Sequence, residues 1–184
     1  MSLRKEVLTE LEQTSFPVCK SRKNVSDNPN SSFVLGTVNY RGQKFVQYKT
    51  KGPSRWNKKF PTLHSLLKKL IKQTKPNFEY TTIQVNKNVT CKPHIDINNV
   101  GKSYIIALGD FTGGELVVEG TEYSIKNKFK CFNGTNVHWT NPFKGTRYAI
   151  VYFTHTFKPP NRSLTNLLIT KHKLSKDGVI LKTY

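Results

Sequence analysis

Apolar residues recur every three or four positions in two stretches of the first half of the chain, which predicts two amphipathic helices. The first stretch covers residues 3–13 and the second covers residues 61–74. This spacing places the apolar side chains along one face of a helix, the face that packs on the rest of the protein. In the second stretch that face consists of Leu63, Leu66, Leu67, Leu70 and Ile71, with lysines on the other side. We therefore expect the second helix to pack on a sheet.

Between the two predicted helices the pattern favours strands and loops. Residues 33–40 and 43–49 predict the two arms of a β-hairpin whose turn starts at Arg41, and the second arm alternates between apolar and polar positions. Residues 17–32 are rich in Ser, Asn, Lys and Pro and predict an exposed loop, and residues 49–60 predict a basic loop.

From Phe78 onward the chain consists of short apolar segments separated by glycine-containing turns, which predicts a run of strands. Such a run is typical of a jelly roll, in which two antiparallel sheets pack face to face. We expect a mainly β protein with flanking helices, of the α+β class, and one further helix at 162–172. The strands are predicted at residues 78–85, 91–96, 103–109, 114–118, 121–125, 128–132, 136–139 and 146–155.

The length of 184 residues fits a single domain, and its charge divides it into three parts. Thirty basic and 11 acidic side chains give a net charge of +19. Residues 1–77 hold 16 basic and 4 acidic side chains, residues 78–155 hold 8 and 6, and residues 156–184 hold 6 and 1. The predicted jelly-roll core at 78–155 is therefore nearly neutral. It lies between a basic N-terminal support of helix, hairpin and helix and a basic C-terminal extension.

Basic flanks of this kind indicate a polyanionic partner, and nucleic acid is the usual one. Lysine outnumbers arginine 24 to 6, so a compositional bias is an alternative source of part of the charge. Trp56 lies among cations, a mixture that can stack a base while holding phosphates, although an indole here can equally cap the core beneath the loop. The residues expected to contact nucleic acid are Arg41, Lys44, Arg55, Trp56, Lys58 and Lys59.

Several classes of protein are disfavoured by the sequence. The first thirteen residues contain acids and no apolar block, so they do not resemble a signal peptide. The longest apolar runs, such as residues 148–153, are too short to span a bilayer. Three widely spaced cysteines without a CxxC pattern suit a reducing compartment. We expect an intracellular protein of the cytoplasm or nucleus, with no membrane association and no obligate protein partner.

The tripeptide His94-Ile95-Asp96 is the strongest chemical signal in the chain. Residues i and i+2 of an extended strand point to the same face, so His94 and Asp96 can present an imidazole and a carboxylate to one point. Two histidines and one carboxylate form the facial triad that suits non-haem Fe(II) and leaves positions open for substrate and O₂. The third ligand would be a later histidine. His138 is well placed, and His155 is the alternative.

Four elements in order resemble the Fe(II)- and 2-oxoglutarate-dependent dioxygenases: His94-x-Asp96, Gly113-Gly114-Glu115-Leu116, His138, and Arg147-Tyr148 in a closing strand. The resemblance covers residues 78–155 and implies a double-stranded β-helix, which is a jelly roll. It also implies that His94, Asp96 and His138 bind Fe(II), with 2-oxoglutarate and O₂ as cosubstrates. Arg147 would hold the far carboxylate of 2-oxoglutarate, a task that suits its planar fork. Asn86 and Asn88 either reach this cosubstrate, as polar residues near this point do in related enzymes, or cap turns.

Within that superfamily, the segments 84–90, 93–101 and 108–116 most resemble the TET/J-binding-protein group. Members of that group hydroxylate the methyl group of thymine or 5-methylcytosine in DNA, releasing succinate and CO₂, so the resemblance implies a nucleic-acid substrate, with DNA preferred over RNA. The segment from His138 through Arg147 also resembles prolyl hydroxylases, which keeps a protein hydroxylase as the alternative. TET-like enzymes often carry a hydroxyl residue two places after the arginine, where this chain has Ala149.

Overall fold

A large antiparallel sheet forms the middle of the protein. The computed structural model describes residues 2–19, 25–26, 30–40 and 50–155. The strands of the large sheet lie in the order β1-β2-β4-β12-β5-β9, and β3 pairs with the outer part of β2. Their bounds are β1 Val18–Cys19, β2 Asn30–Tyr40, β3 Thr50–Pro53, β4 Thr82–Lys87, β5 Asn99–Leu108, β9 Lys130–Asn133 and β12 Tyr148–His155.

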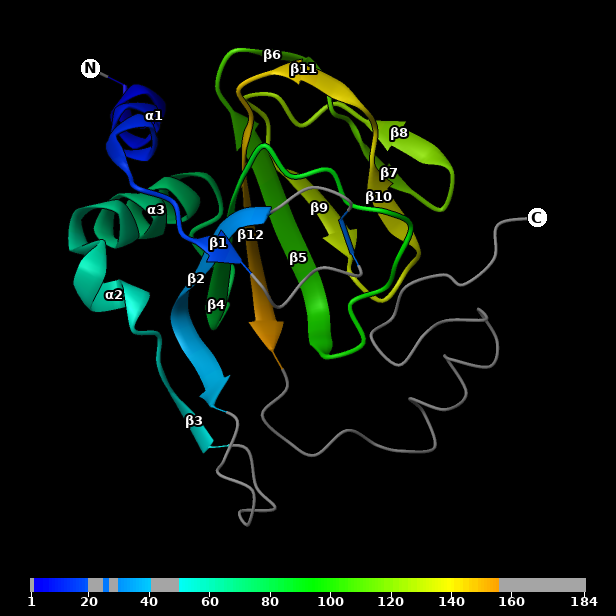
Figure 1. Ribbon diagram of the computed structural model, residues 1–184. Helices are drawn as coiled ribbons and strands as arrows, with labels where there is room; N and C mark the ends of the chain where they lie inside the picture. The colour runs from blue at the N-terminus through cyan, green and yellow to red at the C-terminus, as the bar shows by residue number, and fades with distance from the viewer. Residues whose placement is uncertain (1, 20–24, 27–29, 41–49, 156–184) are drawn as a thin grey trace.

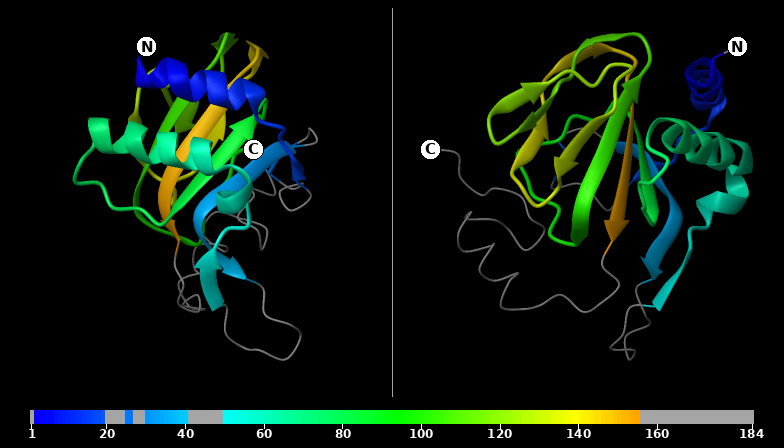
Figure 2. Two further views of the ribbon diagram at one scale, coloured as in Figure 1. Left: turned by 90° about the vertical axis from the view of Figure 1, so that its left-hand side faces the viewer. Right: turned by 180° about the vertical axis from the view of Figure 1, so that it is seen from behind.

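Two small antiparallel sheets form a second β layer. One has the order β10-β7-β8 and the other pairs β11 with β6. In Figures 1 and 2 this layer lies on the side of the large sheet away from the helices, so two β layers face each other as a jelly roll requires. The bounds are β6 Phe111–Gly113, β7 Leu116–Val118, β8 Thr121–Tyr123, β10 His138–Thr140 and β11 Phe143–Gly145.

Three helices cover the other face of the large sheet: α1 Leu3–Gln13, α2 Trp56–Lys59 and α3 Pro61–Thr74. Pro61 at the first position of α3 suits a helix start, because its missing N–H would have no partner there. The buried stripe of α3 packs on sheet residues such as Ile83 and Ile106. The Tyr152 hydroxyl, itself buried, donates to the Leu67 carbonyl oxygen at 2.9 Å and ties the sheet to the helix.

Successive side chains along the strands of the large sheet point to opposite faces, so the sheet has a separate hydrophobic core on each face. Ile106 and its neighbours on one face join the helices in the first core. Ile105 and Ala107, on the opposite face, pack with Leu116 and Phe132 in the second core, between the two β layers. Side chains that face the second core are therefore shielded from the helices by the sheet itself.

The mainly β architecture with flanking helices is confirmed, and the helices predicted at 3–13 and 61–74 have the predicted bounds. The prediction of a strand at 91–96 was wrong, because this segment makes only an isolated bridge at His94. Pro93 has no N–H to give to a ladder, and the Lys92 N–H bonds to the Val25 carbonyl oxygen instead.

Other differences are local. The predicted loop at 17–32 contains β1 and the start of β2, and the predicted basic loop at 49–60 contains β3 and α2. β6 and β11 were not predicted. The second hairpin arm at 43–49 and the helix at 162–172 lie outside the described residues. No helix in the described ranges is long and apolar enough to cross a membrane.

Candidate metal and cosubstrate site

His94 and His138 are paired through their backbones. The His94 N–H donates to the His138 carbonyl oxygen at 3.0 Å, and the His138 N–H donates to the His94 carbonyl oxygen at 2.9 Å. Residues paired in this way across an antiparallel bridge project their side chains to the same side. The two imidazole rings accordingly lie with their centroids 4.3 Å apart, and both are buried. The bridge thus fixes two imidazoles side by side.

Asp96 completes the cluster from the same segment. Its N–H donates to the Gly134 carbonyl oxygen at 2.7 Å, which keeps the chain extended beyond the bridge. Asp96 Oδ1 lies 3.8 Å from His94 Nε2, and Asp96 Oδ2 lies 3.7 Å from His138 Nε2. One donor atom from each of the three residues falls within 4.8 Å of the others. The spacing i, i+2 therefore brings His94 and Asp96 together as expected, although the segment is not a strand.

Each histidine is held in one tautomer. Nδ1 of His94 lies 2.6 Å from the carbonyl oxygen of Lys92, and Nδ1 of His138 lies 2.8 Å from that of Asn136. Because a carbonyl oxygen only accepts, Nδ1 carries the proton in both rings and Nε2 carries the lone pair. Metal-binding histidines commonly donate their other ring N–H in this way. Two imidazole nitrogens and one carboxylate are the donor set of a facial Fe(II) site, so these residues fit that metal.

Arg147 is a buried cation near the second β layer. Only 2% of it is exposed, its guanidinium carbon lies 5.7 Å from the Phe111 ring and 5.4 Å from the Phe143 ring, and Nε has no hydrogen-bond partner among the described residues. Burial lowers the pKa of Arg147 to about 10, partly offset by Cys91 and Glu115. The side chain therefore stays charged at neutral pH, in surroundings that favour an anionic ligand.

Gly114 makes room for this arginine. Its φ is +73°, a conformation that other residues rarely adopt, and a Cβ there would lie 2.9 Å from Arg147 Nε. Of the Gly113-Gly114 pair singled out in the sequence, Gly114 thus allows the close approach of the guanidinium to the backbone. A buried arginine with an unpaired Nε fits the far carboxylate of 2-oxoglutarate, which would satisfy it through charge-assisted hydrogen bonds.

The sequence matches no protein-family model and no curated protein. Solved structures resemble it. One is NgTET1 in complex with 5mC DNA, with a TM-score of 0.56, 14% identity, and coverage of 92% of this chain and 75% of that one. Another is an oxidoreductase of the 2OG-Fe(II) oxygenase family from Burkholderia pseudomallei, with a TM-score of 0.50, 14% identity, and coverage of 85% and 79%. The chain has the 2OG-Fe(II) oxygenase fold. In that fold the His94, Asp96 and His138 cluster lies between the β layers.

In this oxygenase fold, Asn86 and Asn88 take different positions. Asn88 has a φ of +53° and ties down Arg147: its Oδ1 accepts the Arg147 N–H at 2.8 Å, and its own N–H donates to the Arg147 carbonyl oxygen at 2.8 Å. Asn88 thus caps the start of β12. Asn86 lies opposite Ala149 on the neighbouring strand, and its Oδ1 accepts a hydrogen bond from Gln84 at 3.0 Å.

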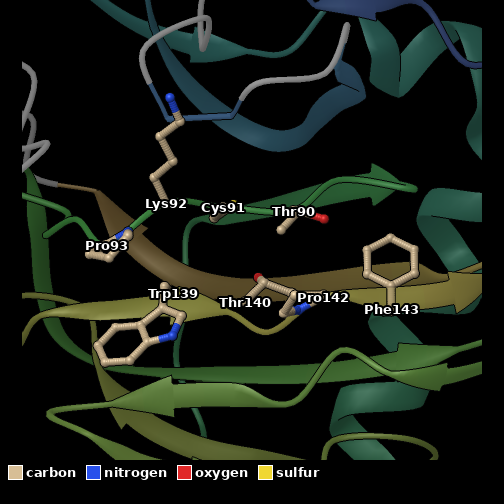
Figure 3. Close-up of a pocket in the computed structure, with 8 residues that line it drawn as sticks. All are labelled: Thr90, Cys91, Lys92, Pro93, Trp139, Thr140, Pro142 and Phe143. Atoms are coloured by element: carbon tan, nitrogen blue, oxygen red, sulfur yellow. The ribbon is translucent and has the colours of Figure 1, made fainter.

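A cavity of about 370 Å³ opens between the two segments that carry the histidines (Figure 3). The Cys91 carbonyl oxygen accepts the Thr140 N–H at 3.0 Å, and the cavity lies along this junction. Phe143, which contacts the Arg147 guanidinium, also lines it. Sequence reasoning did not single out this cavity, whose remaining lining residues are Thr90, Lys92, Pro93, Trp139 and Pro142.

The structure does not bring the expected nucleic-acid contacts next to the histidines. Arg55, Lys58 and Lys59 are exposed on the helical side of the large sheet, whereas the histidines face the second core. The half-buried Trp56 stacks on Phe60 at 5.7 Å and 8°, so it covers the first core as the alternative interpretation expected. Two further expected contacts, Arg41 and Lys44, lie outside the described residues.

Proposed function

We propose that the protein is an Fe(II)- and 2-oxoglutarate-dependent oxygenase that hydroxylates a base in nucleic acid and releases succinate and CO₂. The observation that carries the proposal is the cluster of His94, Asp96 and His138, with donor atoms within 4.8 Å and both histidine tautomers fixed, on an oxygenase fold. Residues 78–155 form the catalytic core, and the basic segments 1–77 and 156–184 flank it.

In this proposal the three clustered side chains hold Fe(II), and Arg147 holds the far carboxylate of 2-oxoglutarate. When bound, iron with 2-oxoglutarate and O₂ supplies the power to oxidise a C–H bond. The protein supplies position and a dry environment. The carbonyl oxygens of Lys92 and Asn136 orient the imidazoles, and Phe132, whose ring lies 5.1 Å from His138, excludes water from one side.

Two observations support nucleic acid as the substrate class. The chain carries a net charge of +19, and one structure of similar fold, NgTET1, was solved with 5mC DNA. The target we propose is therefore the methyl group of a thymine or 5-methylcytosine type base, in DNA in preference to RNA. A base within a duplex must leave the stack before it can reach a buried metal, which selects for single-stranded or easily opened sites.

The test is a substrate panel. The protein with Fe(II), 2-oxoglutarate and ascorbate is incubated with methylated and unmethylated single- and double-stranded DNA, with RNA, and with proline-containing peptides. Succinate and the gain of one oxygen atom in the substrate are measured by mass spectrometry. We expect product on a methylated oligonucleotide from the wild type and none from Asp96→Ala. Glu79→Ala removes a carboxylate whose side chain is 90% exposed and should behave as wild type.

Each outcome decides one part of the proposal. Oxidised peptide with unmodified DNA and RNA would replace the nucleic-acid substrate by the protein hydroxylase alternative. Full succinate production by Asp96→Ala would remove the assigned iron site. The absence of succinate with every substrate, in protein shown to bind Fe(II), would overturn the oxygenase activity itself.

A further inference from the structure

The exposed side of α2 and α3 is cationic. Residues 51–78 contain eight lysines and arginines and no aspartate or glutamate. The apolar stripe of α3 is buried against the sheet, so its lysines all project outward. We call this the helical cationic surface, and its exposed members are Arg55, Lys58, Lys59, Lys68, Lys69 and Lys72.

Within the described residues, acids pair with only one of these cations. In the described part of the chain, α2 and α3 make a single ion pair, between Lys72 Nζ and the exposed Glu79 at 3.5 Å. Burial and, after it, the charge of Lys68 lower the pKa of His64 on the same helix. Arg55 and Lys59 lie over the Trp56 ring at 4.6 and 5.2 Å, which holds both near the surface.

This surface is on the other side of the large sheet from the clustered histidines. α3 packs on the sheet face that carries Ile83 and Ile106, whereas Phe132, which contacts His138, packs on the opposite face. Packed sheets are about 10 Å apart and a helix with its side chains is about 10–12 Å across. The α3 lysines therefore lie on the order of 20 Å from the histidines, with the sheet between them.

Resting on the proposed function, we infer that the helical cationic surface is a second nucleic-acid contact, which binds the phosphate backbone of a stretch of substrate outside the active site. The separation corresponds to about six nucleotides at the 3.4 Å spacing of a duplex strand, and the path over the protein surface around the sheet is longer. An oligonucleotide that only fills the active site cannot reach the surface. Longer substrates gain affinity because their second contact is intramolecular.

The chemistry of the surface favours phosphates over a lipid bilayer. A helix that lies in a membrane interface presents large apolar side chains beside its cations. Here the large apolar residues of α3 face the protein, and Leu63, Leu67, Leu70 and Ile71 are all buried. The exposed positions between the lysines are small or polar residues, including Ser65 and Gln73.

The test compares binding of short and long DNA. Fluorescence anisotropy gives the Kd of labelled single strands of about 5 and about 30 nucleotides as a function of salt, the shorter of which fills about one single-strand binding site. The variant Lys68→Gln/Lys69→Gln/Lys72→Gln keeps helix propensity and the side-chain stems. The control Lys102→Gln/Lys128→Gln/Lys144→Gln removes the same charge from exposed positions outside the helices.

We expect the α3 triple variant to lose most of the preference for the long strand. Its salt slope on that strand should be smaller by about 2 to 3, at roughly 0.7–0.9 per lost contact. The control triple variant should change the preference much less. An equal effect of both triple variants would show that the length preference depends on net charge and not on the helical cationic surface, and would overturn the proposal. Binding to vesicles of anionic lipid without a length-dependent preference for DNA would also overturn it, in favour of a membrane partner.

The wild-type substrate assay separates this proposal from the proposed function. Oxidation of a short methylated strand without any length preference in binding would refute the proposed second contact but not the proposed oxygenase function. A length preference that depends on the α3 lysines, together with no oxidation of any oligonucleotide, would leave the surface standing and remove the base-hydroxylase function.

Discussion

Asn99→Ala should weaken Fe(II) binding although Asn99 is not itself a ligand. Asn99 Nδ2 donates to Asp96 Oδ2 at 3.1 Å, and the Asn99 N–H donates to the Asp96 carbonyl oxygen at 3.0 Å. The side-chain bond fixes the rotation of the carboxylate and so decides how its two oxygens meet the metal. Partners of this kind typically account for about 10- to 100-fold in metal affinity.

The structure places the effect in the lower part of that range. A hydrogen bond to a charged group is worth about 1.5–3 kcal/mol when solvent cannot replace it. The Asp96 side chain is 25% exposed, so water partly substitutes for the lost amide. We therefore expect a loss of about 10- to 30-fold, which is about 1.4 to 2 kcal/mol at 1.4 kcal/mol per decade.

A substitution at Gly134 should disturb the same hydrogen bond between Asn99 and Asp96. A Cβ at Gly134 would lie 2.9 Å from Asn99 Nδ2 and 3.3 Å from Asp96 Oδ2, and the backbone there is not in the left-handed region. Gly134→Ala should therefore displace the amide from the carboxylate without backbone strain. Its loss of Fe(II) affinity should be at least as large as that of Asn99→Ala.

Anaerobic calorimetric titration with Fe(II), repeated with air-stable Co(II), measures both effects. Asn141→Ala is the matched control, because Asn141 Nδ2 donates to the exposed Glu122 carboxylate at 2.9 Å, an amide–carboxylate bond outside the three-residue cluster. It should bind metal as wild type does. Asn99→Ala with a metal Kd within twofold of wild type would refute the reasoning.

Three further predictions follow from buried groups. Arg147→Ala should raise the apparent KM for 2-oxoglutarate much more than the requirement for iron. Arg147→Lys should recover only part of the 2-oxoglutarate affinity, because a point charge lacks the planar fork. Equal dependence on 2-oxoglutarate in the wild type and both variants would argue against a role of Arg147 in binding the cosubstrate. Since the pKa of Arg147 is about 10, the calorimetric affinity for 2-oxoglutarate should gain no pH dependence from this group between about pH 7 and 9, where it stays charged, and should fall as the pH rises past 10. Tyr152→Phe should lower the free energy of unfolding in urea by about 1–3 kcal/mol, because the Leu67 carbonyl oxygen loses a buried donor, and an unchanged midpoint would contradict this.

The sequence predicted the helices well because their apolar spacing is regular and extends over three or four turns. The i, i+2 geometry of His94 and Asp96 was also predictable, since it depends only on an extended backbone. The strand at 91–96 was not, because Pro93 and the long-range bonds of its neighbours decide the pairing. Periodicity carries no information on such partners.

The supporting contacts of the candidate site were beyond the sequence for a similar reason. Asn99 and Gly134 matter because they meet across 35 positions of chain, and the resemblance of the segment 93–101, which contains Asn99, assigned no role to either residue. The charge pattern did indicate a cationic flank, but only the alternation of Ile105 and Ile106 shows which face of the sheet each functional group occupies. The sequence identifies candidate metal ligands and cosubstrate-binding side chains more readily than the residues that orient them.

The bridge between His94 and His138 couples binding of the proposed metal to folding of the protein. Its two residues lie 44 positions apart, so their Nε2 atoms meet only after the intervening strands have paired. An ion that binds only this closed arrangement stabilises it by mass action, by about 2.7 kcal/mol at one hundred times its Kd. If iron binds as proposed, the iron supply of the cell would govern the abundance of this protein as well as its turnover. Loss of iron would remove this stabilisation from the pairing of His138 in β10 with His94.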